Sequence, residues 1–258
     1  MHAKSVLLIL LMLAATAAGA RPASLVFCHE DQDSYPWVLK DRPGLNVLLV
    51  RQLEREIGVP VRLVALPWKR CLAELAANSV DGAFAASFKA ERLEMGRYPM
   101  GKDGKPDPAL RLHMNSYSLY RTRGSALHWN GSRLDNLTGT IGSLAGHSII
   151  DVLRDMGVPV DDRSKSPVDT LRKVVMGRLQ GAVLQTSRVT YVLANNPDLA
   201  AAIERDPTVL DERPYFLLLS FKLVEQEPAF SEQLWRQIER VRESSQFKRS
   251  EQDFYGNN

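Results

Sequence analysis

VRLVALPWKRCLAELAANSVDGAFAA, residues 61–86, is the stretch that decides the fold. Its first part, 61–66, is rich in β-branched and apolar residues and predicts a strand. Apolar residues at helical spacing then predict a helix over 68–78, and the run GAFAA predicts a buried strand over 82–86. Strand, helix and strand in this order predict neighbouring parallel strands in an α/β sheet.

The same pattern continues on both sides. Toward the N-terminus, we expect a strand at 24–28 and a helix at 44–57 that Gly58 ends. A second series starts after the Gly- and Pro-rich loop at 101–111. Its predicted strands are 112–121, 140–144 and 181–184, its predicted helices are 147–156, 167–179 and 187–194, and a strand at 215–223 and a helix at 230–241 follow. Two such series predict two lobes, each with its own mostly parallel sheet, and a small-molecule cleft between them.

The N-terminal end differs from the rest of the chain. Lys4 is the only charged residue among residues 1–20, residues 6–15 are a short apolar run, and Ala18-Gly19-Ala20 has the form of a cleavage site. These features predict a secretory signal peptide, cleaved after Ala20, and a periplasmic protein. The alternative, a membrane anchor, needs about 20 apolar residues. No later segment has the composition of a membrane span, so we expect a soluble product.

The chain has two cysteines, Cys28 and Cys71. In an exported protein an even number of cysteines favours a disulfide, so we expect these two to be paired. The alternative is two separate thiols in the core. Since each lies near the carboxyl edge of the predicted sheet, a bridge would brace the rim of the cleft.

Composition and motifs exclude several classes of function. The 258 residues carry 33 Lys and Arg against 30 Asp and Glu, and no basic cluster has interleaved aromatic residues, so we expect no nucleic-acid partner. The G-x-S-x-G, H-E-x-x-H, C-x-x-C and G-K-[ST] motifs are missing from the sequence. We therefore expect no cofactor and no metal, and we interpret the acidic segment after His29 as a hydrophilic loop.

The segment DGAFAASFKAER, residues 81–92, is the strongest indication of a binding site. A buried strand ends at Ser87, and Arg92 follows near the start of a short helix. A hydroxyl and a nearby guanidinium offer aligned donors to a carboxylate. The alternative, which spacing alone favours, is a surface salt bridge of Arg92.

Six short segments resemble motifs of one protein family. They are Ser34-Tyr35-Pro36-Trp37 (Y-x-P-F), Gly44-Leu45 at the start of a helix, LAANSVDG at 75–82 (L-x-x-G-x-x-D), SFKAER at 87–92 (S-x-T-x-x-R), LDNLTGTIG at 134–142 (DL-x-G-k-x-vGv) and GRLQGA at 177–182 (G-r-x-D-a). In this order they resemble the family 3 extracellular solute-binding proteins, which serve polar amino-acid ABC transporters. The resemblance covers residues 24–250.

The resemblance implies a type II periplasmic-binding-protein fold. Residues 21–112 and 213–258 would form lobe 1, and residues 113–212 lobe 2, with hinge crossings near 112–120 and 210–218. It also implies a monomeric protein, not an enzyme, that closes on a small polar ligand by hinge motion and delivers it to an ABC permease. One alternative is a sensing module of a membrane receptor. Another is a dehydratase-like enzyme, which would need Glu30 or Glu91 as an acid or base.

The resemblance further implies roles for residues of lobe 1. Arg92 would bind a ligand carboxylate, with Ser87 donating a hydrogen bond and Phe88 beside it. Tyr35 and Trp37 would stack on the ligand, or else only pack in their loop. In the family motif a threonine stands where this chain has Lys89, and the interval 81–92 is one residue shorter than usual.

Other positions are less typical of amino-acid binders. Ser148 would add donors at a helix N-terminus, or would only cap that helix. Gln185 stands where such binders place an aspartate for the ligand's ammonium, so an organic acid or a modified ligand fits at least as well as a free amino acid. Trp68 and Arg70 would lie at the cleft edge, or Arg70 would only cover a packed Trp68.

Overall fold

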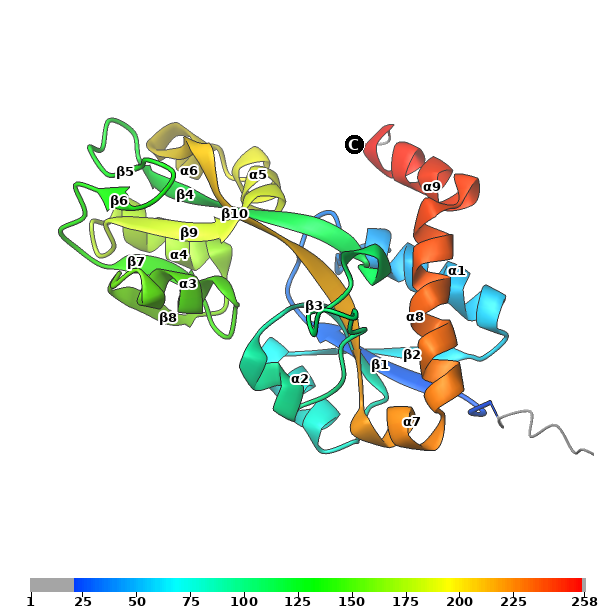
Figure 1. The fold of residues 1–258 in the computed structure, drawn as a ribbon. Coiled ribbons are helices and arrows are strands. Elements are labelled where there is room, and N and C mark those ends of the chain that lie inside the picture. The colour runs from blue at the N-terminus through cyan, green and yellow to red at the C-terminus, as the bar shows by residue number, and fades with distance from the viewer. Residues whose placement is uncertain (1–20, 257–258) are drawn as a thin grey trace, which may run out of the picture.

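The computed structural model describes residues 21–256, which form two lobes joined by the long strands β4 (His113–Thr122) and β10 (Ile203–Leu219), as Figure 1 shows. The predicted signal peptide, residues 1–20, lies outside the described residues. Lobe 1 contains β1 (Leu25–Glu30), α1 (Leu45–Ile57), β2 (Val61–Leu66), α2 (Trp68–Ala76), β3 (Gly82–Ser87), short 3-10 helices at Ala90–Glu94 and Pro108–Leu110, α7 (Phe221–Gln226), α8 (Pro228–Glu243) and α9 (Ser245–Gly256). Lobe 2 contains β5 (His128–Trp129), β6 (Leu134–Asp135), β7 (Ile141–Leu144), α3 (Ile149–Asp155), β8 (Val160–Ser164), α4 (Pro167–Val175), β9 (Gly181–Gln185), α5 (Thr186–Ala194) and α6 (Pro197–Ala202).

The strands are hydrogen-bonded in the order β2-β1-β3-β10-β4-β9-β7-β8. In lobe 1, β1 is parallel to β2 and β3, and in lobe 2, β7 is parallel to β8 and β9. The predicted parallel pairs are therefore confirmed, and the second lobe repeats the strand order of the first. β4 and β10 pair with each other along both lobes, so these two crossing strands connect the parallel sheets of the lobes into one ladder.

The last predicted strand, 215–223, has different limits in the structure. It is the end of β10, and the chain turns into a helix after Leu219 because the Ser220 hydroxyl accepts a hydrogen bond from the backbone N–H of Leu223 at 3.2 Å. β10 also starts earlier than predicted, at Ile203. Within residues 21–256 no helix combines the length and the apolar character that crossing a membrane requires.

The predicted disulfide is confirmed. Cys28 on β1 and Cys71 on α2 are bonded, with their Cα atoms 5.6 Å apart, and both are fully buried. They lie in an apolar cluster with Trp68, Leu75 and Phe216 on one face of the lobe 1 sheet. The bridge therefore ties the first strand to the helix that begins at the cleft.

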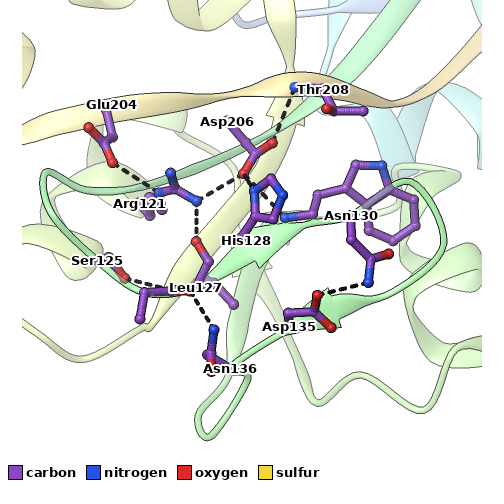
Figure 2. Close-up of polar contacts among 12 residues, drawn as sticks. Arg121, Ser125, Leu127, His128, Asn130, Asp135, Asn136, Glu204, Asp206 and Thr208 are labelled. Atoms are coloured by element: carbon purple, nitrogen blue, oxygen red, sulfur yellow. Dashed lines mark hydrogen bonds and ion pairs between the residues drawn. The ribbon is translucent and has the colours of Figure 1, made fainter.

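A buried carboxylate anchors β10 in lobe 2, away from the cleft. The Asp206 side chain is 0% exposed, and Figure 2 shows the groups that surround it. Its Oδ2 atom accepts hydrogen bonds from Arg121 at 2.9 Å and from the Trp129 backbone N–H at 3.2 Å, and lies 2.7 Å from His128 Nδ1. Asp206 thus connects β10 to β4 and to the small β5–β6 hairpin.

Replacing Asp206 with asparagine should lower the free energy of unfolding by about 2 kcal/mol. The asparagine side chain has the same shape as aspartate but lacks the negative charge that pairs with Arg121. Hydrogen bonds to charged groups contribute about 1.5–3 kcal/mol to stability. Urea unfolding measures the effect. Asp135→Asn is the matched control, because Asp135 pairs at the surface with Arg133 and its loss should change little. Equal midpoints for the two variants would contradict this assignment.

Candidate ligand-binding cleft

A cavity of about 40 Å³ lies between the lobes, at the carboxyl ends of β1, β3 and β9. Open α/β sheets place ligands at this edge. Lobe 1 and its loops contribute His29, Glu30, Ser34, Trp37, Val38, Trp68, Phe84, Ala85, Ser87 and Arg92. The crossing strands and lobe 2 contribute His113, Asn115, Tyr117, His147, Ser148, Gln185 and Tyr215. Since one water needs roughly 10–15 Å³, the cavity has room for about three water molecules.

Six of the nine predicted ligand residues line this cavity and three do not. The six are Trp37, Trp68, Ser87, Arg92, Ser148 and Gln185. Tyr35 instead stacks on Tyr191 of α5 with ring centroids 4.7 Å apart. Arg70 is exposed and pairs with Glu74 along α2. Phe88 is partly exposed and packs edge-on against Tyr98.

Arg92 is a buried cation without an anionic partner. It is 1% exposed, and no carboxylate within residues 21–256 forms an ion pair with it. Its Nη1 donates to the Ser87 carbonyl at 2.6 Å and its Nη2 to the Gly146 carbonyl at 2.9 Å, while its Nε has no partner. The guanidinium lies 5.4 Å from the centre of the Trp68 ring. This environment differs from the surface salt bridge that the spacing alone favoured.

Hydroxyl groups and carbonyls connect the two lobes around Arg92. The Ser87 hydroxyl of β3 and the Ser148 hydroxyl before α3 are 2.7 Å apart. Ser148 therefore faces lobe 1, and its side chain does not cap α3. On the opposite wall, the Ser34 hydroxyl lies 3.5 Å from the Gln185 side-chain oxygen. The lobes thus meet directly on both sides of the cavity.

A charged pair also crosses between the lobes. Glu30, at the end of β1, is 3.1 Å from Arg188 of α5, and its other oxygen is 3.8 Å from His147 Nε2. Burial raises the pKa of Glu30, but the charge of Arg188 and the contact with His147 outweigh burial and lower the pKa to about 2. Glu30 is therefore ionised at neutral pH, and its charge is compensated by Arg188.

The wall formed by β9 of lobe 2 and the crossing strands β4 and β10 is a chain of neutral polar groups. Gln185 Nε2 donates to the Tyr215 hydroxyl at 3.0 Å, which lies 2.8 Å from the Tyr117 hydroxyl. Burial raises the pKa of both tyrosines, so both remain protonated. Burial also lowers the pKa of His113 well below its usual value, so this ring is neutral. It stacks between Trp37, at 3.7 Å, and Tyr215, at 5.0 Å.

Sequence reasoning missed the part of the site that the crossing strands supply. His113, Asn115 and Tyr117 of β4 line the cavity, as does Tyr215 of β10. The sequence contained a pattern that could have indicated these residues. Positions 113, 115 and 117 are two apart along one strand, so their side chains lie on the same face. Asn115 is 5% exposed, and its side chain makes no hydrogen bond to the rest of the described chain.

Metal binding requires a cluster of ligating side chains, and acid–base catalysis requires a carboxyl group with a suitable pKa. Within residues 21–256, no three His, Cys, Asp or Glu side chains gather as ligands would. Neither carboxyl group considered for acid–base catalysis has a raised pKa. The Glu30 value is lowered, as described, and the hydrogen bond from Lys89 lowers the pKa of Glu91, which lies outside the cavity. The guanidinium of Arg92 and the hydroxyl groups of Ser87 and Ser148 give the lining several hydrogen-bond donors.

Comparison with solved structures extends these findings; a scan of protein-family models and a search of curated proteins gave no match. A histidine kinase sensor domain with similarity to periplasmic binding proteins superposes with a TM-score of 0.73 at 15% identity, over 90% of this chain and 96% of that one. The GluR0 ligand-binding core from Nostoc punctiforme, in complex with L-glutamate, gives 0.68 at 16% identity, over 90% and 98%. An ancestral arginine-binding protein bound to glutamine gives 0.70 at 14% identity, over 92% and 100%. The resemblance to solute-binding proteins is thereby confirmed at the level of the fold, and the chain has the two-lobed α/β fold of periplasmic binding proteins.

Proposed function

We propose that this protein captures a small, carboxylate-bearing ligand, an amino acid or a related compound, between its two lobes. The observation that carries the proposal is Arg92, a fully buried guanidinium at the interlobe cavity that has no anionic partner among residues 21–256. A buried charge needs compensation, and a carboxylate matches the donor geometry of a guanidinium. The similar structures bound to L-glutamate and to glutamine support the same class of ligand.

The remaining lining residues have supporting roles in this proposal. Ser87 and Ser148 donate to the carboxylate from opposite lobes, so a bound ligand draws the lobes together. Trp37 and Trp68 provide rigid apolar walls. Gln185 positions the Tyr215 hydroxyl at the far wall. Because these contacts come from both lobes, ligand binding favours the closed arrangement by its differential affinity for it.

The proposed setting is the periplasm, with delivery of the ligand to an ABC permease. The disulfide supports an oxidising compartment. The alternative, a sensing module for a membrane receptor, is supported by the similarity to a histidine kinase sensor domain. Deleting the gene separates the two roles: a loss of radiolabelled ligand uptake indicates transport, and unchanged uptake with a lost transcriptional response to the ligand indicates sensing.

Replacing Arg92 with alanine should weaken ligand binding at least tenfold, about 1.4 kcal/mol, because the ligand carboxylate loses its counter-charge. A thermal-shift screen of amino acids, short peptides and organic acids identifies the ligand. A compound at 100 times its Kd adds about 2.7 kcal/mol to the stability of the folded protein. Calorimetric titration of the hit then compares wild type and variant.

Two further variants keep this test interpretable. Arg92→Gln removes the charge but keeps a polar, partly similar side chain at this position, and it replaces the alanine variant in the test if that variant does not fold. Arg70→Ala removes an exposed arginine of α2 outside the cavity and should bind as the wild type does. Equal affinities for the wild type and both Arg92 variants would remove Arg92 from the site.

A further inference from the structure

The charged side chains around the cavity limit which charged groups the ligand can carry, and this narrows the ligand class given in the proposed function. Among the described residues that line it, Glu30 is the one acidic side chain and Arg92 the one arginine or lysine. Glu30 is already compensated by Arg188. Burial lowers the pKa of His29 and His113, so neither adds a charge at neutral pH. His147 also lines the cavity and lies beside Glu30, 3.8 Å from its carboxylate. The permanent positive charge of Arg92 has no carboxylate partner among the described residues.

Among the described residues of the lining, a ligand ammonium would find only Glu30 as a carboxylate, and Glu30 is already paired with Arg188. Diverting Glu30 to an ammonium would leave Arg188 unpaired, and Arg188 is 2% exposed with its Nε and Nη2 already lacking partners. Leaving a buried charge without its partner is strongly destabilising. Gln185 is a neutral amide engaged with Tyr215. The cleft therefore compensates a carboxylate but not an accompanying ammonium.

The cavity also contains an unused neutral group. The Asn115 amide is nearly buried, lines the cavity and makes no hydrogen bond to another described residue. An amide both donates and accepts, so it suits a hydroxyl or keto oxygen. A ligand that satisfied Arg92 and Asn115 together would combine a carboxylate with such an oxygen.

We infer that the cleft takes a small monocarboxylic acid that carries a neutral hydroxyl or keto oxygen and no ammonium group. The inference rests on the proposed function, since it assigns the ligand class of the same site. In it, Arg92 binds the carboxylate and Asn115 the neutral oxygen. Glu30 stays paired with Arg188.

Matched pairs of compounds test this inference. L-Lactate and L-alanine, 2-hydroxyisovalerate and L-valine, and 3-phenyllactate and L-phenylalanine differ within each pair only in a hydroxyl against an ammonium. In calorimetric titrations at pH 7, the hydroxy acid of the pair that fits should bind at least tenfold more tightly than its amino acid. Asn115→Ala should reduce that affinity to the level of the acid without the hydroxyl, for example propionate in place of lactate.

The variant Gln185→Asp provides the opposite control, because it supplies the missing carboxylate and should move the preference toward the amino acid of the pair. Tighter or equal binding of the amino acids by the wild type would overturn the inference and leave the proposed function standing. The inference would also be overturned, and the proposed function kept, if the screen found a ligand whose binding depends on Arg92 but no hydroxy or keto acid that binds. If no compound of the pairs or of the wider screen binds, both proposals fail.

Discussion

Replacing Cys28 and Cys71 together with alanine should lower the free energy of unfolding by about 4 kcal/mol. The disulfide joins residues 43 positions apart, and closing a loop of that length reduces the entropy of the unfolded chain by about this amount. Both positions are fully buried in an apolar cluster, so alanine introduces no polar group there. Urea unfolding of the wild type and the double variant measures the difference.

Reduction provides the control for this prediction. Dithiothreitol should lower the unfolding midpoint of the wild type toward that of the double variant and leave the variant unchanged. We also expect weaker ligand binding in the variant, since β1 carries Glu30 and α2 begins at Trp68, both of which line the cavity. A wild type whose midpoint is insensitive to reductant would contradict the stabilising role of the bridge.

The parallel halves of the fold could be predicted because their strands are short apolar runs between amphipathic helices. β2 has the predicted limits, 61–66, and α1 starts within one residue of the prediction. The first part of β10 could not be predicted in this way. Residues 203–214 are charged and irregular, and they form a strand only because β4 lies beside them. Pairing of that kind depends on distant residues and leaves no local pattern.

The candidate site was predictable where a residue's direction follows from its element. Ser87 ends a buried strand and lines the cavity, whereas Phe88, the next residue, packs on Tyr98 and is not part of the lining, which fits the alternation of side chains along an extended chain. Trp68 and Arg70 are two positions apart on α2, and residues at that spacing do not share a helix face. This is why Trp68 lines the cavity and Arg70 does not.

The contacts of the loop residues and of the crossing strands could not be predicted from neighbouring residues in the sequence. Tyr35 and Trp37 lie in one loop, yet Trp37 stacks on His113 in the cavity wall and Tyr35 stacks on Tyr191 of the other lobe. Only the packing of the whole molecule decides between these directions. The partner of Glu30 is equally remote, because Arg188 lies 158 positions away in the sequence. The compensation of that charge, which restricts the ligand class, emerges only from the fold.

Exchanging Glu30 for glutamine should shift the balance between open and closed lobes toward the open form. Glu30 belongs to lobe 1 and Arg188 to lobe 2, so separating the lobes breaks their 3.1 Å contact. Without the carboxylate, closure buries an uncompensated guanidinium. Arg188 and His147, both of lobe 2, outweigh burial and lower the pKa of Glu30 to about 2, so the ionised carboxylate favours the form that contains the pair.

The pH dependence of closure has a definite sign. Because the pKa of Glu30 is lower when the pair is formed, its contribution is complete above about pH 4.5 and is lost as the pH falls toward 2. Small-angle X-ray scattering at pH 7 and at pH 3.5 should show a partial expansion of the wild type on acidification, because pH 3.5 lies between the two pKa values and removes part of the contribution. Glu30→Gln should be expanded already at pH 7, whereas Glu74→Gln, which removes a pair within α2, should resemble the wild type. A Glu30→Gln protein as compact as the wild type at pH 7 would mean that the serine and backbone contacts around Arg92 suffice to hold the lobes together, and the ion pair would then have no part in closure.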